Sequence, residues 1–395
     1  MEHGWRWFGT DDPITLPEIR QTGANVVVSA LHGAPPEAPW SVEAIRAHQK
    51  MIEAAGLRWS VVESVPVPEA IKQGGDTTAR DRAIGVFCQT LENLAVCGIE
   101  TVCYNFMPIL DWTRTELAHP VASGGVALRF DQPTFAAFEL FILKRPGARA
   151  HYSDAEIESA RQIADALGDK ARRRLTDTLI AGLPGADQHY SLETFRKALA
   201  AYERIDEARL RENFSHFLRA VVPVAERLGM RLAIHPDDPP RPLLGLPRIM
   251  STAADVRWML EQIESPANGL TFCTGSFGVR EDNDLVAMAW AFAPHIHFAH
   301  LRATRRDLND PASFIEADHL AGDVDMVGVI TELKREERRR EREGGAAITM
   351  RPDHGHLLCD DRHRPTNPGY PLIGRLKGLA ELRGVESAVA HFLND

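Results

Sequence analysis

The segment RLAIHP, residues 231–236, gives the clearest indication of the fold. It is a short apolar run that stops at His235, a residue type that binds transition metals. Three later segments follow the same pattern: Phe272-Cys273-Thr274, Phe298-Ala299-His300 and Pro352-Asp353-His354. Runs of this kind are typical of buried parallel strands, and in a barrel of such strands the side chains at the carboxyl ends converge on one mouth. The pattern therefore predicts a parallel α/β fold in which four ligand-type residues meet.

A rhythm of strand followed by helix extends outward from this segment in both directions. Strands are predicted at residues 5–8, 25–30, 58–63, 101–106, 231–235, 269–273, 295–300 and 347–351. Helical patterns lie between and after them, at 16–21, 41–55, 79–96, 210–228, 253–263, 284–292, 326–340 and 372–382. Strand and helix in eightfold alternation indicate a (β/α)₈ TIM barrel, and we expect one barrel domain over residues 1–395.

The rhythm breaks between residues 111 and 207, which carry helical patterns but no convincing strand. This stretch is too long for an ordinary connection of about 2–6 residues. Within it, Ser153-Asp154-Ala155-Glu156 has the pattern of a capping box that opens a helix. We interpret the stretch as a helical insertion after the fourth strand, either a lid or an interface. An independent domain is the alternative on length alone.

Composition excludes several classes of protein. The formal charge of −10 argues against a general nucleic-acid or anionic-membrane surface. No stretch approaches the roughly 18 apolar residues that cross a bilayer, and the N-terminus lacks the pattern of a signal peptide. The five cysteines are odd in number and have no CxxC spacing, which favours reduced thiols in a cytoplasmic protein.

The residues at the last four strand ends form a chemically complete set. Two imidazoles, a thiolate and a carboxylate can hold one divalent cation; they are His235, Cys273, His300 and Asp353. His300 competes with His295 and His297 on the same strand and is preferred for its terminal position. Taken singly, each of these residues could have a structural role instead. The coincidence of four strand ends favours a mononuclear metalloenzyme.

Longer motifs carry a family resemblance that covers essentially the whole chain. They are Glu63-Ser64-Val65-Pro66-Val67, Tyr104-Asn105-Phe106-Met107-Pro108, Asp111-Trp112-Thr113-Arg114-Thr115, His235-Pro236-Asp237-Asp238-Pro239-Pro240, Phe272-Cys273-Thr274-Gly275-Ser276, His300-Leu301-Arg302 and Arg351-Pro352-Asp353-His354-Gly355-His356. Together they resemble the mannonate dehydratase family. The resemblance implies a TIM barrel like that of xylose isomerase and one Mn²⁺ or Fe²⁺ per subunit. It also implies conversion of D-mannonate to 2-dehydro-3-deoxy-D-gluconate and water in hexuronate (glucuronate) catabolism.

The same resemblance implies roles for single residues. The four ligand-type residues match the family's metal ligands, His354 matches a proton-transfer residue, and Tyr370, in Pro368-Gly369-Tyr370-Pro371, is similar to the catalytic tyrosine. Dehydration requires one group to take the proton at C2 and another to protonate the leaving 3-hydroxyl. The sequence leaves open which residue does which. Substrate contacts are predicted for Asn105, Arg114, Arg302 and His319, although both arginines could equally form structural ion pairs.

Three other functions compete with this interpretation. A metal-dependent sugar isomerase or epimerase on the same barrel is the nearest alternative, and the thiolate of Cys273 disfavours it. A metal-dependent phosphodiesterase would need two or three ions and a basic crescent. A non-catalytic sugar-acid-binding regulator is disfavoured by the full set of metal and proton-transfer candidates. We expect a small sugar acid as partner, no nucleic acid, no membrane, and a homo-oligomer, dimer or higher.

Overall fold

The computed structural model describes residues 1–180 and 190–393. Eight parallel strands close into a barrel in the order β1-β12-β9-β8-β7-β4-β3-β2. They are β1 (Glu2–Arg6), β2 (Val26–Ser29), β3 (Arg58–Glu63), β4 (Thr101–Tyr104), β7 (Arg231–Ile234), β8 (Asn268–Cys273), β9 (Ile296–His300) and β12 (Thr349–Arg351). The predicted TIM barrel is confirmed.

The first strand differs from its prediction. It occupies Glu2–Arg6, whereas the apolar residues placed it at 5–8. Trp7 lies just beyond the ladder, and its backbone N–H still donates to the Val28 carbonyl at 2.9 Å. The aromatic residues that suggested a later strand therefore begin the loop at the barrel mouth.

The barrel strands are apolar on both faces because each face is covered. Alternate residues of five strands fill the barrel interior, namely Val28, Val61, Cys103, Ala233 and Phe298. Their neighbours, such as Val27, Val62 and Leu232, point outward and pack against the helices. This alternation between two buried faces is the reason that the strands read as continuous hydrophobic runs.

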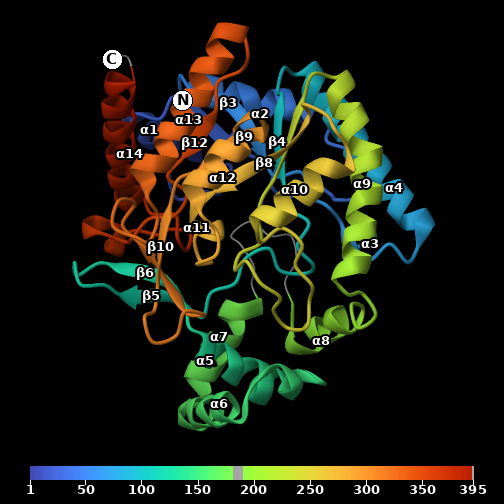
Figure 1. The fold of residues 1–395 in the computed structure, drawn as a ribbon, viewed down its shortest axis with the longest axis vertical. Coiled ribbons are helices and arrows are strands. Elements are labelled where there is room, and N and C mark those ends of the chain that lie inside the picture. The colour runs from blue at the N-terminus through green and yellow to red at the C-terminus, as the bar shows by residue number, and fades with distance from the viewer. Residues whose placement is uncertain (181–189, 394–395) are drawn as a thin grey trace.

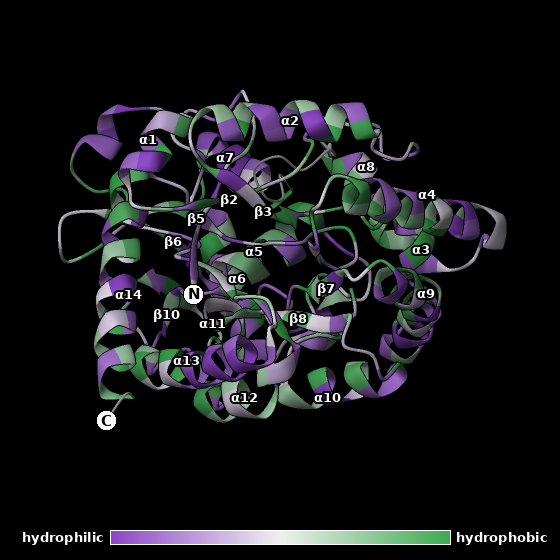
Figure 2. Cartoon of the chain, turned by 90° about the horizontal axis from the view of Figure 1, so that it is seen from above, coloured by the Kyte–Doolittle hydropathy of each residue, from purple (hydrophilic) through white to green (hydrophobic). Residues whose placement is uncertain are grey.

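Amphipathic helices surround the barrel (Figure 2). They include α1 (Leu16–Gln21), α2 (Val42–Ala54), α3 (Glu69–Gln73), α4 (Thr77–Val96), α9 (Glu207–Arg227), α10 (Ala253–Gln262), α12 (Leu285–Ala291), α13 (Met326–Glu343) and α14 (Leu372–Phe392). Several begin at the side-chain caps that the sequence offers, for example Ser41 before α2 and Asp206 before α9. The predicted apolar face of α9 is confirmed, since Leu210, Phe214 and Phe217 are fully buried.

The predicted insertion contains strands as well as helices. β5 (Glu116–Pro120) and β6 (Val126–Phe130) join β10 (Ala303–Arg306) and β11 (Phe314–Ala317) in a four-stranded antiparallel sheet, in the order β10-β11-β6-β5. The expectation of helices alone was wrong for this part, because short strands with partly exposed, polar residues give little periodic signal.

Helices make up the rest of the insertion. They are α5 (Gln132–Ala137), a π-helical segment at Phe138–Leu143, α6 (Asp154–Ala166), α7 (Asp169–Ile180) and α8 (Leu192–Ala200). The predicted capping box is present at Ser153 and Glu156. Figure 1 shows these helices gathered at one end of the barrel, at the bottom of the view. Residues 181–189 of the predicted insertion lie outside the described residues.

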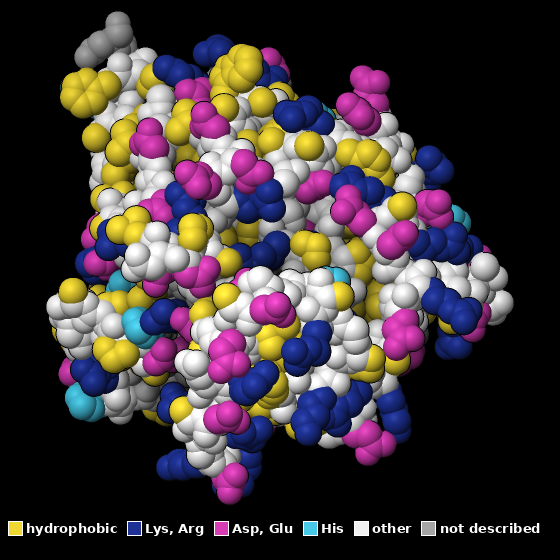
Figure 3. Space-filling model, turned by 60° about the horizontal axis from the view of Figure 1, so that its bottom comes forward, with side chains coloured by type: hydrophobic (Ala, Val, Ile, Leu, Met, Phe, Trp, Pro, Cys, Tyr) yellow, Lys and Arg dark blue, Asp and Glu magenta, His cyan; other side chains and the backbone are white. Residues whose placement is uncertain are grey.

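The outer surface is mixed in charge. Lys and Arg side chains are interspersed with Asp and Glu over the face that Figure 3 shows. Within the described part of the chain, every helix is too short or too polar to cross a membrane.

Candidate functional site

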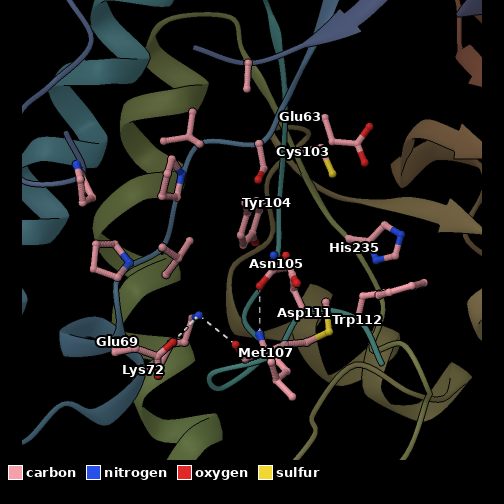
Figure 4. A pocket seen from close by; sticks show the side chains of 18 of the residues that line it. Glu63, Glu69, Lys72, Cys103, Tyr104, Asn105, Met107, Asp111, Trp112 and His235 are labelled. Carbon is pink, nitrogen blue, oxygen red and sulfur yellow. Dashed lines mark hydrogen bonds and ion pairs between the residues drawn. The ribbon is translucent and has the colours of Figure 1, made fainter. Parts of the chain in front are cut away.

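A cavity of about 910 Å³ opens where the barrel strands end. Its wall is built from the carboxyl ends of the strands and from the loops that follow them. Figure 4 labels Glu63 at the end of β3, Asn105 and Trp112 in the loop after β4, and His235 just after β7, all of which line the cavity. Trp112 belongs to the start of the predicted insertion, so the insertion contributes to the wall.

The four predicted ligands meet at this mouth. The candidate ligand atoms of His235, Cys273 and His300 all lie within 4.8 Å of one another. Nε2 of His235 is 3.2 Å from Nδ1 of His300. Oδ2 of Asp353 is 3.9 Å from the Cys273 sulfur and 3.8 Å from Nδ1 of His300. Four donors at bond lengths of about 2.0–2.3 Å from one tetrahedral ion would lie about 3.3–3.8 Å apart, close to these separations.

The hydrogen bonds of the two imidazoles fit a bound cation. Nδ1 of His235 lies 2.7 Å from the Pro236 carbonyl, which only accepts, so this nitrogen carries the proton and Nε2 presents a lone pair. Nε2 of His300 lies 3.5 Å from the Glu63 carboxylate, which favours a proton there and a lone pair on Nδ1. Burial lowers the pKa of His235, but the hydrogen bond with Cys273 and the Cys273 charge outweigh burial and raise this pKa to about 9. The two nitrogens that face each other at 3.2 Å therefore share a positive charge, either a proton or a metal ion. The donor set therefore fits one divalent transition metal.

The Cys273 side chain is held in a setting that favours the thiolate. Its sulfur accepts hydrogen bonds from the backbone N–H of Ser276 at 3.4 Å and from the Ser276 hydroxyl at 3.2 Å. Burial alone raises the pKa of Cys273. The positive charge of Arg302 and hydrogen bonds with His235 and His300 outweigh burial and hold this pKa well below its ordinary value. Because the thiolate is the metal-binding form, Cys273 is suited to be a ligand.

Asp353 is fixed by two arginines. Its Oδ1 is 2.5 Å from Nη1 of Arg351, and its Oδ2 is 2.6 Å from Nε of Arg302. Arg351 also donates to both oxygens of Glu63, at 3.1 and 2.8 Å. Burial raises the pKa of Asp353, but the Arg351 charge and then the neighbouring histidines and Arg302 keep it well below the ordinary value. The carboxylate is thus charged and oriented.

A buried cluster of two arginines and two carboxylates lies beside the candidate ligands, and we call it the charge cluster: Arg114, Arg302, Asp238 and Glu316. Arg114 donates to Asp238 at 2.7 Å and to Glu316 at 2.7 Å. Arg302 donates to Glu316 at 2.6 Å and also contacts Asp238. Every charge in the cluster therefore faces the opposite sign, as burial requires.

His354 and Tyr370 lie next to each other on the cavity wall. Their rings meet edge to face, with centroids 5.0 Å apart at 89°. Nδ1 of His354 is 3.1 Å from Oε1 of Glu316, so the charge cluster also orients this imidazole. Burial and the negative charge of Asp353 raise the pKa of the Tyr370 phenol. The arrangement places an oriented imidazole and a protonated phenol side by side.

The four predicted substrate contacts divide into two pairs. Asn105 and Arg302 are among the cavity-lining residues. Arg114 and His319 are not part of the wall that the described residues form. Arg114 is fully buried with Asp238 and Glu316, and Nε2 of His319 is 2.8 Å from the Pro352 carbonyl. The placement of these two side chains therefore gives no support to direct substrate contact.

Sequence reasoning missed four charged residues of the site. Glu63 and Arg351 are the last residues of β3 and β12, so the strand-end rule that found the ligands applies to them as well. Asp238 follows His235 within one quoted motif. Glu316 gave no signal, because it lies in β11, a strand that was not predicted.

Comparison with known proteins gives consistent matches. A family model described as D-mannonate dehydratase (UxuA) matches residues 1–394. A mannonate dehydratase from Chromohalobacter salexigens is 65% identical over 390 residues, which are 98% of this chain and 99% of that one. A mannonate dehydratase from Marinomonas sp. is 54% identical over 387 residues, 98% of each chain.

Solved structures agree. The crystal structure of mannonate dehydratase from Streptococcus suis is 31% identical and has a TM-score of 0.78, over 100% of this chain and 95% of that one. A xylose isomerase domain protein from Planctomyces limnophilus has a TM-score of 0.52 at 11% identity, over 99% of each chain. The second match shows the fold alone.

The Glu63–Arg351 pair yields a stability prediction. Glu63→Gln removes one charge from a buried pair, and we expect the free energy of unfolding to fall by about 3–5 kcal/mol. Glu193→Gln is the matched control, because its 2.8 Å pair with Lys197 is mostly exposed; there we expect a loss below about 1 kcal/mol. Urea unfolding measures both. Equal losses in the two variants would contradict the role of Glu63 as the partner of a buried arginine.

Proposed function

The chain belongs to the D-mannonate dehydratase family, and from this premise we propose how its barrel mouth removes water from D-mannonate. The enzyme is a hydro-lyase that converts D-mannonate to 2-dehydro-3-deoxy-D-gluconate and water, a reaction of hexuronate catabolism. One observation carries the mechanism: His235 and Asp353, at the edge of the candidate ligand cluster, line the same cavity as the neighbouring pair His354 and Tyr370.

We infer that one Mn²⁺ or Fe²⁺ is held by His235, Cys273, His300 and Asp353. The thiolate and imidazoles favour a transition metal over Mg²⁺, which prefers oxygen ligands. Bound there, the cation would act as a Lewis acid toward the substrate carboxylate and 2-hydroxyl, and so stabilise the negative charge that develops when C2 loses its proton.

His354 is suited to take the C2 proton. Its Nδ1 faces the Glu316 carboxylate at 3.1 Å, and a carboxylate only accepts, so the proton of the neutral ring lies on Nδ1. Nε2 then presents a lone pair. We assign His354 as the general base on this ground.

Tyr370 is placed to protonate the leaving group, because its ring lies on the cavity wall beside His354 and a phenol carries its proton at neutral pH. The 3-hydroxyl then leaves as water while the pair of electrons from the C2–H bond forms a double bond between C2 and C3. The resulting enol becomes the 2-keto-3-deoxy acid when C3 gains a proton and the enol oxygen loses one. Tyr370 is thus the proposed general acid.

We assign substrate contacts to the two predicted residues on the wall, Asn105 and Arg302. Arg114 lies behind Arg302 and shares its two carboxylates, so it positions that side chain. His319 donates to the Pro352 carbonyl next to Asp353, and so supports the loop that carries the ligand. We therefore assign Arg114 and His319 positioning roles and no direct contact with the substrate.

The insertion is proposed to cover the bound substrate. Trp112 and Ile180, at its start and at the end of α7, line the cavity. Exclusion of water favours a reaction in which charge develops on the substrate. An interface between subunits remains the second interpretation of the insertion. A homo-oligomeric state and a cytoplasmic location also stay predictions.

Metal content tests the ligand assignment. Chelation should abolish activity, Mn²⁺ or Fe²⁺ should restore it, and Mg²⁺ should restore little. Cys273→Ser should weaken metal binding about tenfold or more. Loss of a residue that only hydrogen-bonds to a metal ligand already lowers metal affinity by about that factor, and loss of the ligand itself should cost at least as much. Cys103→Ser is the control: that thiol is also buried in the barrel, and it accepts from Thr271 at 3.2 Å. Full activity in excess chelator would refute the assignment.

Turnover tests the proton-transfer pair. His354→Asn and Tyr370→Phe should retain the metal and bind D-mannonate, yet lose about 10²–10⁴ in kcat. Steady-state rates of 2-keto acid formation, metal analysis and calorimetric binding measure the three properties. If either variant turns over at the native rate, its residue has no catalytic role. If His354→Asn loses the metal, the division of labour between Asp353 and His354 is wrong.

Limited proteolysis tests whether the insertion covers the bound substrate. D-Mannonate should slow tryptic cleavage within residues 145–180 of the metal-loaded enzyme if this part closes over the substrate. Cleavage elsewhere in the chain serves as the internal control. Rates that do not change with substrate would favour the interface interpretation.

A further inference from the structure

The cavity extends to the side of the barrel that faces the candidate ligands. In the strand order, β1 lies opposite β7, β2 opposite β8, and β3 opposite β9. The ligands follow β7, β8 and β9, with Asp353 after β12, so the mouth has a second half that the proposed chemistry leaves unused. Residues from the ends of β1 and β2, including Arg6 and His32, line this half.

Two polar side chains in this half have buried atoms without partners. Arg6 is the last residue of β1, and its side chain is 11% exposed. Its Nε is buried without a hydrogen-bond partner among the described residues, as is Nε2 of His32, and its buried Nη1 has only a 3.3 Å ion pair with Glu63. Leaving such a buried group without a partner costs free energy, so these atoms call for a ligand. Both side chains line the cavity, so a bound ligand can reach them.

The two side chains share one apolar support. Cζ of Arg6 lies 4.9 Å from the centre of the Phe8 ring, and the His32 ring is 5.7 Å from that of Phe8. Phe8 also contacts the proposed general acid: its ring packs edge to face against Tyr370, with centroids 4.9 Å apart. A chain of ring contacts thus runs from the proton-transfer pair to Arg6 and His32.

The chemistry of this half suits hydroxyl groups better than a second carboxylate. Nη1 of Arg6 is 3.3 Å from Glu63, which already balances part of its charge. Burial, and then the charge of Arg6, lowers the pKa of His32 to about 3, so the ring is neutral and offers one donor and one acceptor. Guanidinium donors beside a neutral imidazole match a pair of neighbouring hydroxyls.

We propose that Arg6 and His32 form a subsite for the terminal hydroxyls of the sugar acid, at C5 and C6. The proposal rests on the proposed function, which places the carboxylate and C2 at the four candidate ligands. The substrate would then extend across the mouth, past Tyr370 and Phe8, with its far end between the two side chains. The subsite makes the enzyme selective for the length of the chain.

A substrate that is one carbon shorter tests the contact between the subsite and the C6 hydroxyl. D-Lyxonate has the configuration of D-mannonate at C2, C3 and C4 but lacks C6 and its hydroxyl. A site built to hydrogen-bond a hydroxyl rejects an analogue that lacks it, because its own polar groups then stay unpaired. The wild-type enzyme should therefore prefer D-mannonate in kcat/KM by about tenfold to a hundredfold.

Arg6→Met and His32→Phe remove the polar atoms and keep side-chain bulk. Each should lower kcat/KM for D-mannonate by about tenfold or more, mainly through a higher KM, and should lower kcat/KM for D-lyxonate less, because this acid keeps only the C5 hydroxyl. The ratio of kcat/KM for D-mannonate to kcat/KM for D-lyxonate then falls toward one. Arg82→Met is the matched control, because Arg82 also lines the cavity but is exposed and lies outside the subsite; it should leave the preference unchanged.

Metal content and thermal unfolding verify that each variant is folded and loaded, and His32→Phe carries the test if Arg6→Met does not fold. Equal losses on both substrates, or a wild-type enzyme that does not distinguish them, would overturn the subsite. Calorimetric binding of the two acids gives the same comparison without turnover. Wild-type protein that binds D-mannonate but forms no 2-keto acid would refute the proposed function, and the binding data would still decide the subsite.

Discussion

The site depends on a series of buried charges of alternating sign. It runs through one carboxylate or arginine after another: Glu63, Arg351, Asp353, Arg302, then Asp238 and Glu316, and finally Arg114. Removing such charges from water is costly, and each is tolerated only because its neighbours in the series compensate it. The candidate ligand Asp353 lies in the middle of the series, held by an arginine on each side. Its position is therefore set by the whole network rather than by its own loop.

This constraint explains why the barrel carries a second sheet. Glu316 lies on β11, Arg302 lies between β9 and β10, and Arg114 lies two residues before the start of β5. The antiparallel sheet β10-β11-β6-β5 thus brings to the barrel mouth the charges that complete the series. Through Glu316 it also reaches His354. The small sheet and the start of the insertion therefore orient two candidate site residues, the imidazole of His354 and the guanidinium of Arg302.

The sequence predicted what depends on local pattern and missed what depends on long-range pairing. The barrel strands were visible because both faces are buried, and the candidate ligands were visible because each lies at or just after a strand end. The pairing of Arg114 was not visible: its partners Asp238 and Glu316 are 124 and 202 residues away along the chain. An arginine that binds substrate and one that binds a buried carboxylate look the same in sequence. The strands β5, β6, β10 and β11 were missed because they are short, and β6 finds its partner β11 only far along the chain.

The two halves of the barrel mouth differ in what fixes their side chains. Around β7, β8, β9 and β12, the buried arginines and carboxylates pair with one another in the charge series, so substitution there disturbs several partners at once. Around β1 and β2, Arg6 and His32 keep buried nitrogens without a hydrogen-bond partner among the described residues, and the Phe8 ring separates them from Tyr370. A change in this half can alter which substrate is accepted and leave the proton-transfer pair in place. In the proposed assignment, recognition of the far end of the substrate and proton transfer thus lie on different sides of the barrel mouth, and the series of buried charges fixes the side chains of the second.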